Sequence, residues 1–542
     1  MAFRISIIFT GFVVAYAALL FNIFNLQLQE GAYYAARAES QHRAGGALVP
    51  PRGSIFITDK NGAKIPAAIN RDYPLIFAVP KELSDAAEAA EKLAGIVGKT
   101  PVELAAMLAK PNDPYESLVK RATGEQIDAV RTLDLAGVYV DAESGRFYPL
   151  GSLVSHVVGF SNFDDEETRV VGRYGAEFAY DERLAGSPGS ASGDSLVPYV
   201  PGEDVVLTID RNIQSRAWEI LSALIKEKNA RGGSFIVQES KTGKILAMGG
   251  VPDFDPNEYG KAELRTFLNP TVQGVYEPGS VFKVFTMAAG LDTGAITPET
   301  TYYDSGSVTL NGRTIRNWDL KAHGKQTMTN VIEQSLNTGA IFAMQKTGYE
   351  QFERYLIAFG FADPTGIGLP GELKGNLNNL KNGRDVNYAT ASFGQGISVT
   401  ALELVNAVST IANGGMRMRP YILMSESPKE AGRVISEEAA RKVTQMMVSA
   451  VEKAEIARIP RYAVAGKTGT AFIPDFKRGG YTDNVINTYV GFAPANDPQF
   501  TVLVRLDDPA GAPLAGLTVV PAFRELTKFI LNYYNIPPDR PQ

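Results

Sequence analysis

The chain has 542 residues, which is long enough for about two or three domains. Its 53 Lys and Arg residues and 59 Asp and Glu residues give a formal net charge of −6, so it lacks the basic excess of nucleic-acid-binding proteins. It has no cysteine, which excludes thiol catalysis, disulfide bonds and thiolate metal sites. His42, His156 and His323 are scattered without metal-ligand spacing, and we expect each to be a structural or surface residue.

A long uncharged segment, residues 5–29, opens the chain. At roughly 1.5 Å per residue, a helix of this length measures about 37 Å, enough to span a hydrocarbon core of ~30 Å with some tilt. Arg4 precedes the segment, which favours a cytoplasmic N-terminus. Residues 15–17, Ala-Tyr-Ala, resemble a signal-peptide cleavage site, but they lie inside the apolar run rather than after it. We therefore expect residues 1–29 to form an uncleaved transmembrane anchor, with the remainder outside the cytoplasm.

Residues 30–202 have a mixed, soluble composition without an obvious catalytic constellation. A predicted strand closed by an Asn-Gly turn follows Arg52, and Arg52 and Asp59 could form an ion pair. The pattern also predicts short amphipathic helices over residues 86–93, 101–109 and 125–133. A stretch rich in glycine and serine at residues 184–193 marks the end of the region. We interpret this region as a non-catalytic stalk or interaction domain.

Residues 203–542 show the pattern of a larger mixed domain. Strands are predicted over residues 205–210, 233–239, 245–248, 488–492 and 499–506. Helices are predicted over residues 211–228, 280–291, 328–346, 351–359, 401–412 and 520–534. Because strands lie near both ends with helices between them, we expect an α+β fold in which one antiparallel sheet is covered by helices on both faces.

Ser280 and Lys283 form an S-x-x-K pair at the start of an apolar helical segment. Pro278 and Gly279 favour a helix that begins near Ser280, and the i,i+3 spacing puts Lys283 on the same face as the serine hydroxyl. A serine hydroxyl is a weak nucleophile until a base takes its proton, and a lysine whose pKa is lowered by apolar neighbours can be that base. On its own, such a pair is more often a capping serine followed by a surface lysine.

Two further short motifs follow in chain order. Ser335 and Asn337 form an S-x-N motif, and Lys467, Thr468 and Gly469 form a K-T-G motif in a strand-like run. In this order, S-x-x-K, S-x-N and K-T-G are the three-part signature of the penicillin-recognising serine acyltransferases. Each motif is weak alone, but together they indicate one active site.

With these residues in view, the chain resembles the class B penicillin-binding proteins, the membrane-anchored DD-transpeptidases of bacterial cell-wall synthesis. The resemblance covers nearly the full length. Besides the three motifs, it includes Arg52-Gly53-x-Ile55, Arg146-x-Tyr148-Pro149, Gly175-x-Glu177, Gly394-Gln395-Gly396 and Asn413-Gly414-Gly415. A class A member would carry a glycosyltransferase domain as well, for which the region between anchor and transpeptidase leaves no room.

The resemblance implies roles for the first two motifs. Ser280 would be the acylated nucleophile, attacking the penultimate carbonyl of a D-Ala-D-Ala stem peptide and expelling the last D-Ala. Lys283 would be its general base. The hydroxyl of Ser335 would relay a proton to the leaving amine, and the amide of Asn337 would hold Lys283 and the substrate backbone.

The third motif would bind the substrate and complete the oxyanion hole. Lys467 would supply positive charge facing the S-x-N serine, while the hydroxyls of Thr468 and Thr470 would meet the substrate carboxylate. Gly469 would let the peptide approach the strand edge closely. The oxyanion would lie between the backbone amides of Ser280 and Thr470. A β-lactam would acylate the same serine, and no metal or organic cofactor is expected, because the chain itself provides nucleophile, base and oxyanion donors.

The resemblance implies a peptidoglycan DD-transpeptidase, and we expect the septal type used in cell division. Its expected partners are stem peptides, a membrane glycan polymerase and associated division or elongation proteins, with no nucleic acid. The expected location is the bacterial inner (cytoplasmic) membrane, crossed once, with an extracytoplasmic catalytic domain. The alternatives are an elongation-type transpeptidase, a DD-carboxypeptidase or β-lactamase-like hydrolase, and a catalytically inert scaffold.

Overall fold

The computed structural model describes residues 2–24, 47–48, 50–110, 115–164, 169–192, 195–475, 477–511 and 514–540. The chain divides into two compact units. One consists of residues 68–149, and the other of residues 1–67 together with residues 150–542. The boundaries expected after residues 29 and 202 stay predictions.

The smaller unit is a three-stranded antiparallel arrangement with three short helices. Its long central strand, β3 (Lys64–Ala78), pairs with β4 (Glu116–Lys120) and β5 (Val138–Phe147). The helices are α3 (Ala86–Val97), α4 (Pro101–Leu108) and α5 (Gly124–Leu133). Each helix begins at a side-chain cap, namely Asp85, Thr100 and Thr123, which explains why their starts could be predicted.

The larger unit begins with helix α1 (Ala2–Phe24). Residues 25–29, the end of the predicted anchor, lie outside the described residues. Within the part of the chain that the structure describes, no helix combines the length and the apolar character needed to cross a membrane.

Arg52 makes ion pairs that the sequence did not predict. Its guanidinium lies 2.7 Å from a carboxylate oxygen of Glu177 and 2.7 Å from one of Asp181. The expected pair with Asp59 is wrong: Asp59 instead accepts backbone N–H groups within its own turn, at 2.8 and 2.9 Å. Nearness in the sequence suggested Asp59, whereas the fold brings Arg52 to residues more than a hundred positions further along.

Replacing Arg52 by alanine is expected to lower the free energy of unfolding by about 3 kcal/mol, because it removes a guanidinium that pairs with the carboxylate of Glu177, which is 0% exposed. Chemical denaturation of the full chain measures this loss. The matched control is Arg183→Ala, which removes an exposed pair with Glu203 and is expected to cost less than about 1 kcal/mol. Equal losses in the two variants would contradict the assignment.

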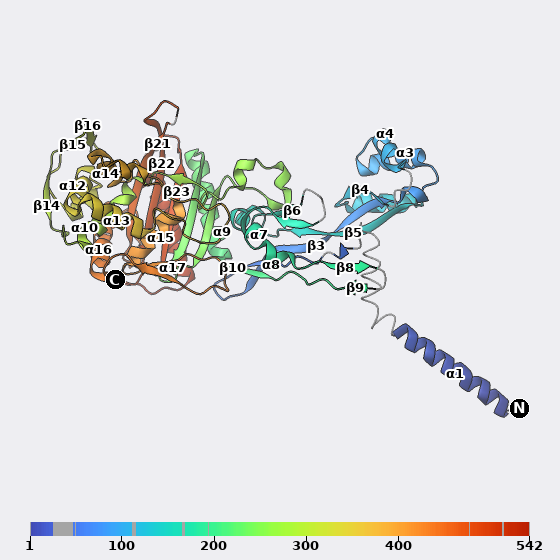
Figure 1. Cartoon of the computed structure of the whole chain (residues 1–542). Coiled ribbons are helices and arrows are strands. Elements are labelled where there is room, and N and C mark those ends of the chain that lie inside the picture. The colour runs from blue at the N-terminus through green and yellow to red at the C-terminus, as the bar shows by residue number, and fades with distance from the viewer. Residues whose placement is uncertain are drawn as a thin grey trace. The chain divides into compact units, whose positions relative to one another are not determined.

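The core of the larger unit is a five-stranded antiparallel sheet with the order β12-β11-β23-β22-β21 (Figure 1). Its strands are β11 (Gly232–Glu239), β12 (Ile245–Val251), β21 (Ala465–Pro474), β22 (Tyr481–Ala493) and β23 (Phe500–Asp507). Helices α9 (Arg211–Lys228) and α17 (Val519–Tyr533) pack together on one face, and α15 (Ala401–Ala412) packs on the sheet from the other face. The predicted α+β architecture is therefore confirmed.

The long segment between β12 and β21 forms most of the other helices. They are α10 (Lys283–Asp292), α11 (Met328–Gln334), α12 (Asn337–Thr347), α13 (Tyr349–Phe359), α14 (Asp385–Ala391) and α16 (Glu437–Ala454). The single helix predicted over residues 328–346 is wrong, because Ser335 takes a left-handed conformation, with φ 57° and ψ 45°, and separates α11 from α12. Helix α16 was not predicted.

Short elements connect these parts within the larger unit. Those that come before residue 211 in the sequence are β1 (Ala47–Leu48), β2 (Ile55–Thr58), α6 (Ser155–Val158), β6 (Ser161–Phe163), β7 (Val170–Gly172), α7 (Gly175–Ala179), α8 (Asp181–Ala185), β8 (Gly189–Ser192), β9 (Ser195–Val197) and β10 (Val205–Asp210). Strand β10 pairs in parallel with β2. In the chain segment between β12 and β21 lie the short strands β13 (Val275–Tyr276), β14 (Thr301–Asp304), β15 (Ser307–Leu310), β16 (Arg313–Arg316), β17 (Gly324–Thr327), β18 (Val399–Thr400), β19 (Met416–Met418) and β20 (Glu430–Arg433).

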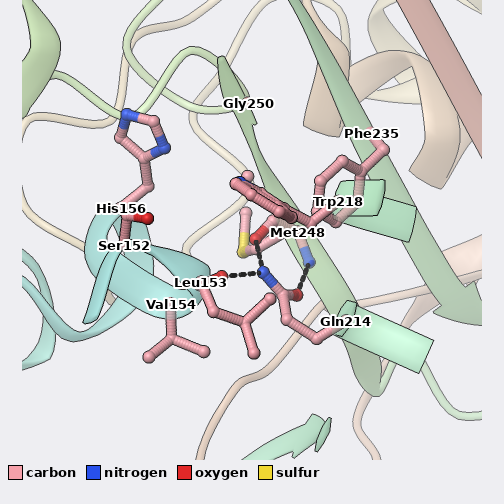
Figure 2. A pocket seen from close by; sticks show the side chains of 10 residues that line it. Ser152, Leu153, Val154, His156, Gln214, Trp218, Phe235, Met248 and Gly250 are labelled. Atoms are coloured by element: carbon pink, nitrogen blue, oxygen red, sulfur yellow. Dashed lines mark hydrogen bonds between the residues drawn. The ribbon is translucent and has the colours of Figure 1, made fainter. Parts of the chain in front are cut away.

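The two histidines that the structure describes are structural, as expected. Figure 2 shows a pocket lined by His156 and Gln214, in which the side-chain amide of Gln214 donates to the carbonyls of Leu153 and Met248 at 2.8 and 3.1 Å. The ring of His156 lies 3.0 Å from a backbone carbonyl, and burial lowers its pKa to about 4. His323 lies 3.0 Å from a carboxylate, and His42 lies outside the described residues. Among the residues described, no group of His, Asp and Glu side chains could hold a metal ion.

Candidate active site

Ser280 lies in a tight turn that is pressed against strand β21. A 3-10 turn over Gly279–Phe282 leads into α10, which confirms that helical structure begins near Ser280. Gly279 has φ +57°, and a Cβ atom there would lie 2.7 Å from the carbonyl oxygen of Thr470. Only glycine allows this approach, which brings the backbone beside Ser280 against the backbone of Thr470.

Lys283 is fully buried and contacts both candidate serines. Its Nζ lies 3.0 Å from Oγ of Ser280, 2.6 Å from the carbonyl oxygen of Ser335 and 3.1 Å from Oγ of Ser335. Burial lowers the pKa of Lys283 well below its ordinary value, and the charge of Lys467 lowers it further. A neutral amine this close to Ser280 can accept the proton of the serine hydroxyl.

Lys467 faces the same serine from strand β21. Its Nζ lies 3.1 Å from Oγ of Ser335 and 3.2 Å from Oγ1 of Thr468, and burial lowers its pKa to about 7. β21 is the last strand of the sheet, so its outer edge can pair with an extended peptide. The hydroxyl of Thr470 donates to the side chain of Asn487 at 3.2 Å.

The side chain of Asn337 is bound by a neighbouring loop, and its expected role stays a prediction. Its side-chain amide donates to the carbonyl of Arg316 at 2.8 Å, and within the residues described here it makes no hydrogen bond to Lys283. Its backbone N–H donates to Oδ1 of Asn317 at 3.0 Å. The S-x-N motif is thus held by a neighbouring loop that carries no sequence signature.

The structure brings four predicted residues into one chain of contacts. Ser280, Lys283, Ser335 and Lys467 follow one another at 3.0, 3.1 and 3.1 Å. A continuous path of hydroxyl and amine groups can move a proton between a nucleophile and a leaving group on the same wall. These contacts join three segments that lie far apart in the sequence.

Sequence reasoning missed a carboxylate three residues before Ser280, that of Glu277. Glu277 accepts the hydroxyl of Tyr481 at 3.0 Å and the backbone N–H of Gly396 at 3.0 Å. It thereby ties the segment before Ser280 to the start of β22 and to the predicted Gly394–Gly396 loop. A lone Glu before Pro-Gly carries no chemical pattern, so the sequence gave no signal for this contact.

The chain matches the penicillin binding protein transpeptidase domain over residues 233–528 and the penicillin-binding protein dimerisation domain over residues 47–193. It is 33% identical to stage V sporulation protein D of Bacillus subtilis over 503 residues, which cover 87% of this chain and 76% of that protein. It is 29% identical to peptidoglycan D,D-transpeptidase FtsI of Escherichia coli over 514 residues, covering 89% and 84%.

Among solved structures, penicillin-binding protein 3 of Mycobacterium tuberculosis in complex with aztreonam has a TM-score of 0.71 at 27% identity, covering 91% of this chain and 98% of that one. The transpeptidase match includes all three motifs and the sheet that positions them. This chain therefore belongs to the class B penicillin-binding proteins, the serine-type peptidoglycan D,D-transpeptidases.

Proposed function

We propose that Ser280 is the acylated nucleophile and Lys283 its general base. The observation that carries this proposal is the buried amine of Lys283, 3.0 Å from Oγ of Ser280. Lys283 takes the hydroxyl proton as Oγ of Ser280 forms a bond to the carbonyl carbon of the penultimate D-Ala. The backbone amides of Ser280 and Thr470 stabilise the resulting oxyanion.

Collapse of this tetrahedral intermediate breaks the peptide bond to the last D-Ala. The proton held by Lys283 passes through Ser335 to the leaving amine, and D-Ala departs. The amine of a second stem peptide then attacks the ester carbonyl, loses its proton along the same path and releases Ser280. Lys467, Thr468, Gly469 and Asn337 are proposed to hold the donor peptide along β21.

An exchange assay separates a transpeptidase from a hydrolase. The full chain is given a stem peptide ending in D-Ala-D-Ala together with a labelled D-amino acid, and the products are separated by mass. A transpeptidase transfers the acyl group to the amine, so the labelled peptide is expected to be the main product. A product formed only with water would favour the carboxypeptidase alternative instead.

The proposed roles require Lys283 to be neutral and Lys467 to be charged. The charge of Lys467 makes Lys283 lose its proton first, and Lys467 itself has a pKa of about 7. We therefore expect kcat/KM for acylation by an anionic penicillin to rise with pH, reach a maximum and fall above about pH 7. Acylation rates measured from about pH 5 to 9 test this. A rate that still increases at the alkaline end would contradict the role of Lys467.

Residues 1–29 are proposed to anchor the protein in the cytoplasmic membrane, with residues 30–202 as a non-catalytic domain and residues 203–542 as the transpeptidase. The uncharged run from residue 5 to residue 29 supports the anchor. Because this class carries no glycosyltransferase, a membrane glycan polymerase is the proposed partner. Fractionation of cells that express the full chain tests the anchor, and recovery in the soluble fraction would contradict it.

The proposed physiological role is septal wall synthesis during cell division, for which the compact length and the motifs provide the support. A sporulation role is a second candidate, supported by 33% identity with stage V sporulation protein D. A fluorescent fusion in the native cell distinguishes them. Septal synthesis predicts a band at mid-cell, elongation a lateral distribution, and sporulation a signal confined to sporulating cells.

β-Lactams are proposed to acylate Ser280. The Mycobacterium tuberculosis relative, which has been solved in complex with aztreonam and with ampicillin, supports this proposal. A penicillin such as ampicillin has a reactive carbonyl and a carboxylate, as the stem peptide does, so Lys283 and the K-T-G motif are proposed to bind the two in the same way.

A further inference from the structure

Ser335 holds a backbone conformation that residues other than glycine rarely adopt. Its φ is 57° and its ψ is 45°, in the left-handed region. In this conformation both its carbonyl oxygen and its Oγ face Nζ of Lys283, at 2.6 and 3.1 Å. Such a conformation persists only where the surrounding structure fixes it, and it often marks a functional site.

Two consecutive residues hold the backbone on either side of Ser335. The indole Nε1 of Trp318 donates to the carbonyl of Gln334 at 3.0 Å, immediately before Ser335. Oδ1 of Asn317 accepts the backbone N–H groups of Asn337 and Thr338, at 3.0 and 3.3 Å, just after it. Helix α12 has no side-chain cap from its own N-terminal residue, so Asn317 provides this cap from outside the helix.

Asn317 is in turn fixed by a buried carboxylate. Its Nδ2 donates to Oδ2 of Asp304 at 2.8 Å, and the hydroxyl of Thr338 donates to Oδ1 of Asp304 at 2.8 Å. Asp304 is 0% exposed and Asn317 is 1% exposed. Asp304 also accepts the backbone N–H groups of Gly306 and His323, so its carboxylate is held both by its own loop and by α12. This network holds Asn317 in place beside the N-terminus of α12.

We propose that Asn317 and Trp318 are positioning residues of the acylation step, which hold Ser335 in the conformation that directs its carbonyl and hydroxyl to Lys283. This inference rests on the roles proposed above for Ser280 and Lys283. Among the hydrogen bonds of the described residues, none joins Asn317 or Trp318 to Ser280, and both residues act through the backbone that flanks Ser335. Their loss therefore affects the alignment of the amine and hydroxyl groups rather than the binding of the ligand.

The test is stopped-flow acylation of the full chain by a fluorescent penicillin, which gives the binding constant and the acylation rate constant separately. For Asn317→Ala, the rate constant is expected to fall on the order of 100-fold, and for Trp318→Phe about 10-fold, with unchanged binding constants. The matched control is Asn330→Ala, which removes capping hydrogen bonds at the opposite end of α11. It is expected to lower thermal stability but to acylate at the unmodified rate.

Trp318 is 60% exposed, so Trp318→Phe is expected to fold. Its acylation rate constant therefore tests the inference even if Asn317→Ala does not fold. The inference is overturned if Trp318→Phe acylates at the unmodified rate, or if Asn317→Ala loses no more activity than Asn330→Ala. Absence of acylation in the unmodified protein would instead overturn the roles of Ser280 and Lys283, and with them this inference. A loss confined to the binding constant would assign Asn317 and Trp318 to ligand contact and would also overturn it.

Discussion

The Ser280→Ala variant is expected to form no covalent adduct with penicillin and to exchange D-Ala at a rate lower by at least about 10³-fold. Oγ of Ser280 is the atom that Lys283 can deprotonate, at 3.0 Å. Ser335 is not expected to replace it, because the proposed oxyanion donors are the backbone amides of Ser280 and Thr470, and the close approach of Gly279 to Thr470 brings them beside Ser280. Gel fluorescence with a labelled penicillin and the exchange assay both measure the loss.

A matched control for Ser280→Ala is Ser215→Ala. Ser215 lies on helix α9, where its hydroxyl contacts the side chain of Glu219. This variant is expected to be labelled like the unmodified protein, and both variants are expected to unfold at similar temperatures. Labelling of Ser280→Ala at the level of the control would mean that another residue is the nucleophile.

The Lys283→Met variant is expected to lose acylation by about 10³-fold, the usual contribution of a general base, and yet to be at least as stable as the unmodified protein. Methionine preserves most of the side-chain volume of Lys283 while removing an amine that is 0% exposed. Burying the amine of Lys283 destabilises the folded protein, although catalysis requires the amine. Removing the amine is therefore expected to lower activity without lowering stability.

The pH dependence of stability tests the same point. The folded-state pKa of Lys283 lies well below its ordinary value of 10.5. Between these two pKa values Lys283 binds a proton in the unfolded chain but not in the folded chain. The burial of Lys283 therefore lowers the free energy of unfolding in this pH range, and this loss becomes smaller as the pH rises. The advantage of Lys283→Met in thermal unfolding should therefore shrink as the pH approaches 10.5. A variant that is less stable than the unmodified protein at neutral pH would contradict a desolvated amine.

Local patterns predicted much of the fold and the centre of the site. Helix α9 begins and ends where its apolar period indicated, at Arg211 and Lys228, because Asp210 caps it and Asn229 ends it in a left-handed conformation. The motifs placed Ser280, Lys283 and Lys467 together because their order and spacing reflect one chemical arrangement.

Long-range contacts could not be predicted in this way. The pairing of Arg52 with Glu177 joins residues 125 positions apart, and no local period encodes it. The break at Ser335 was missed because a serine in the left-handed conformation has no signature of its own, and the loop residues Asn317 and Trp318 that hold it belong to no recognisable motif. In both cases the tertiary structure overrides the local preference.

The most direct test of the acyl-enzyme is to locate the penicillin adduct by mass spectrometry. The full chain is incubated with penicillin, its intact mass is measured, and the modified peptide is sequenced after proteolysis. One adduct per chain, on Ser280, is the predicted result. An adduct on any other residue, or none while the protein remains folded, would contradict the assignment of Ser280 and Lys283.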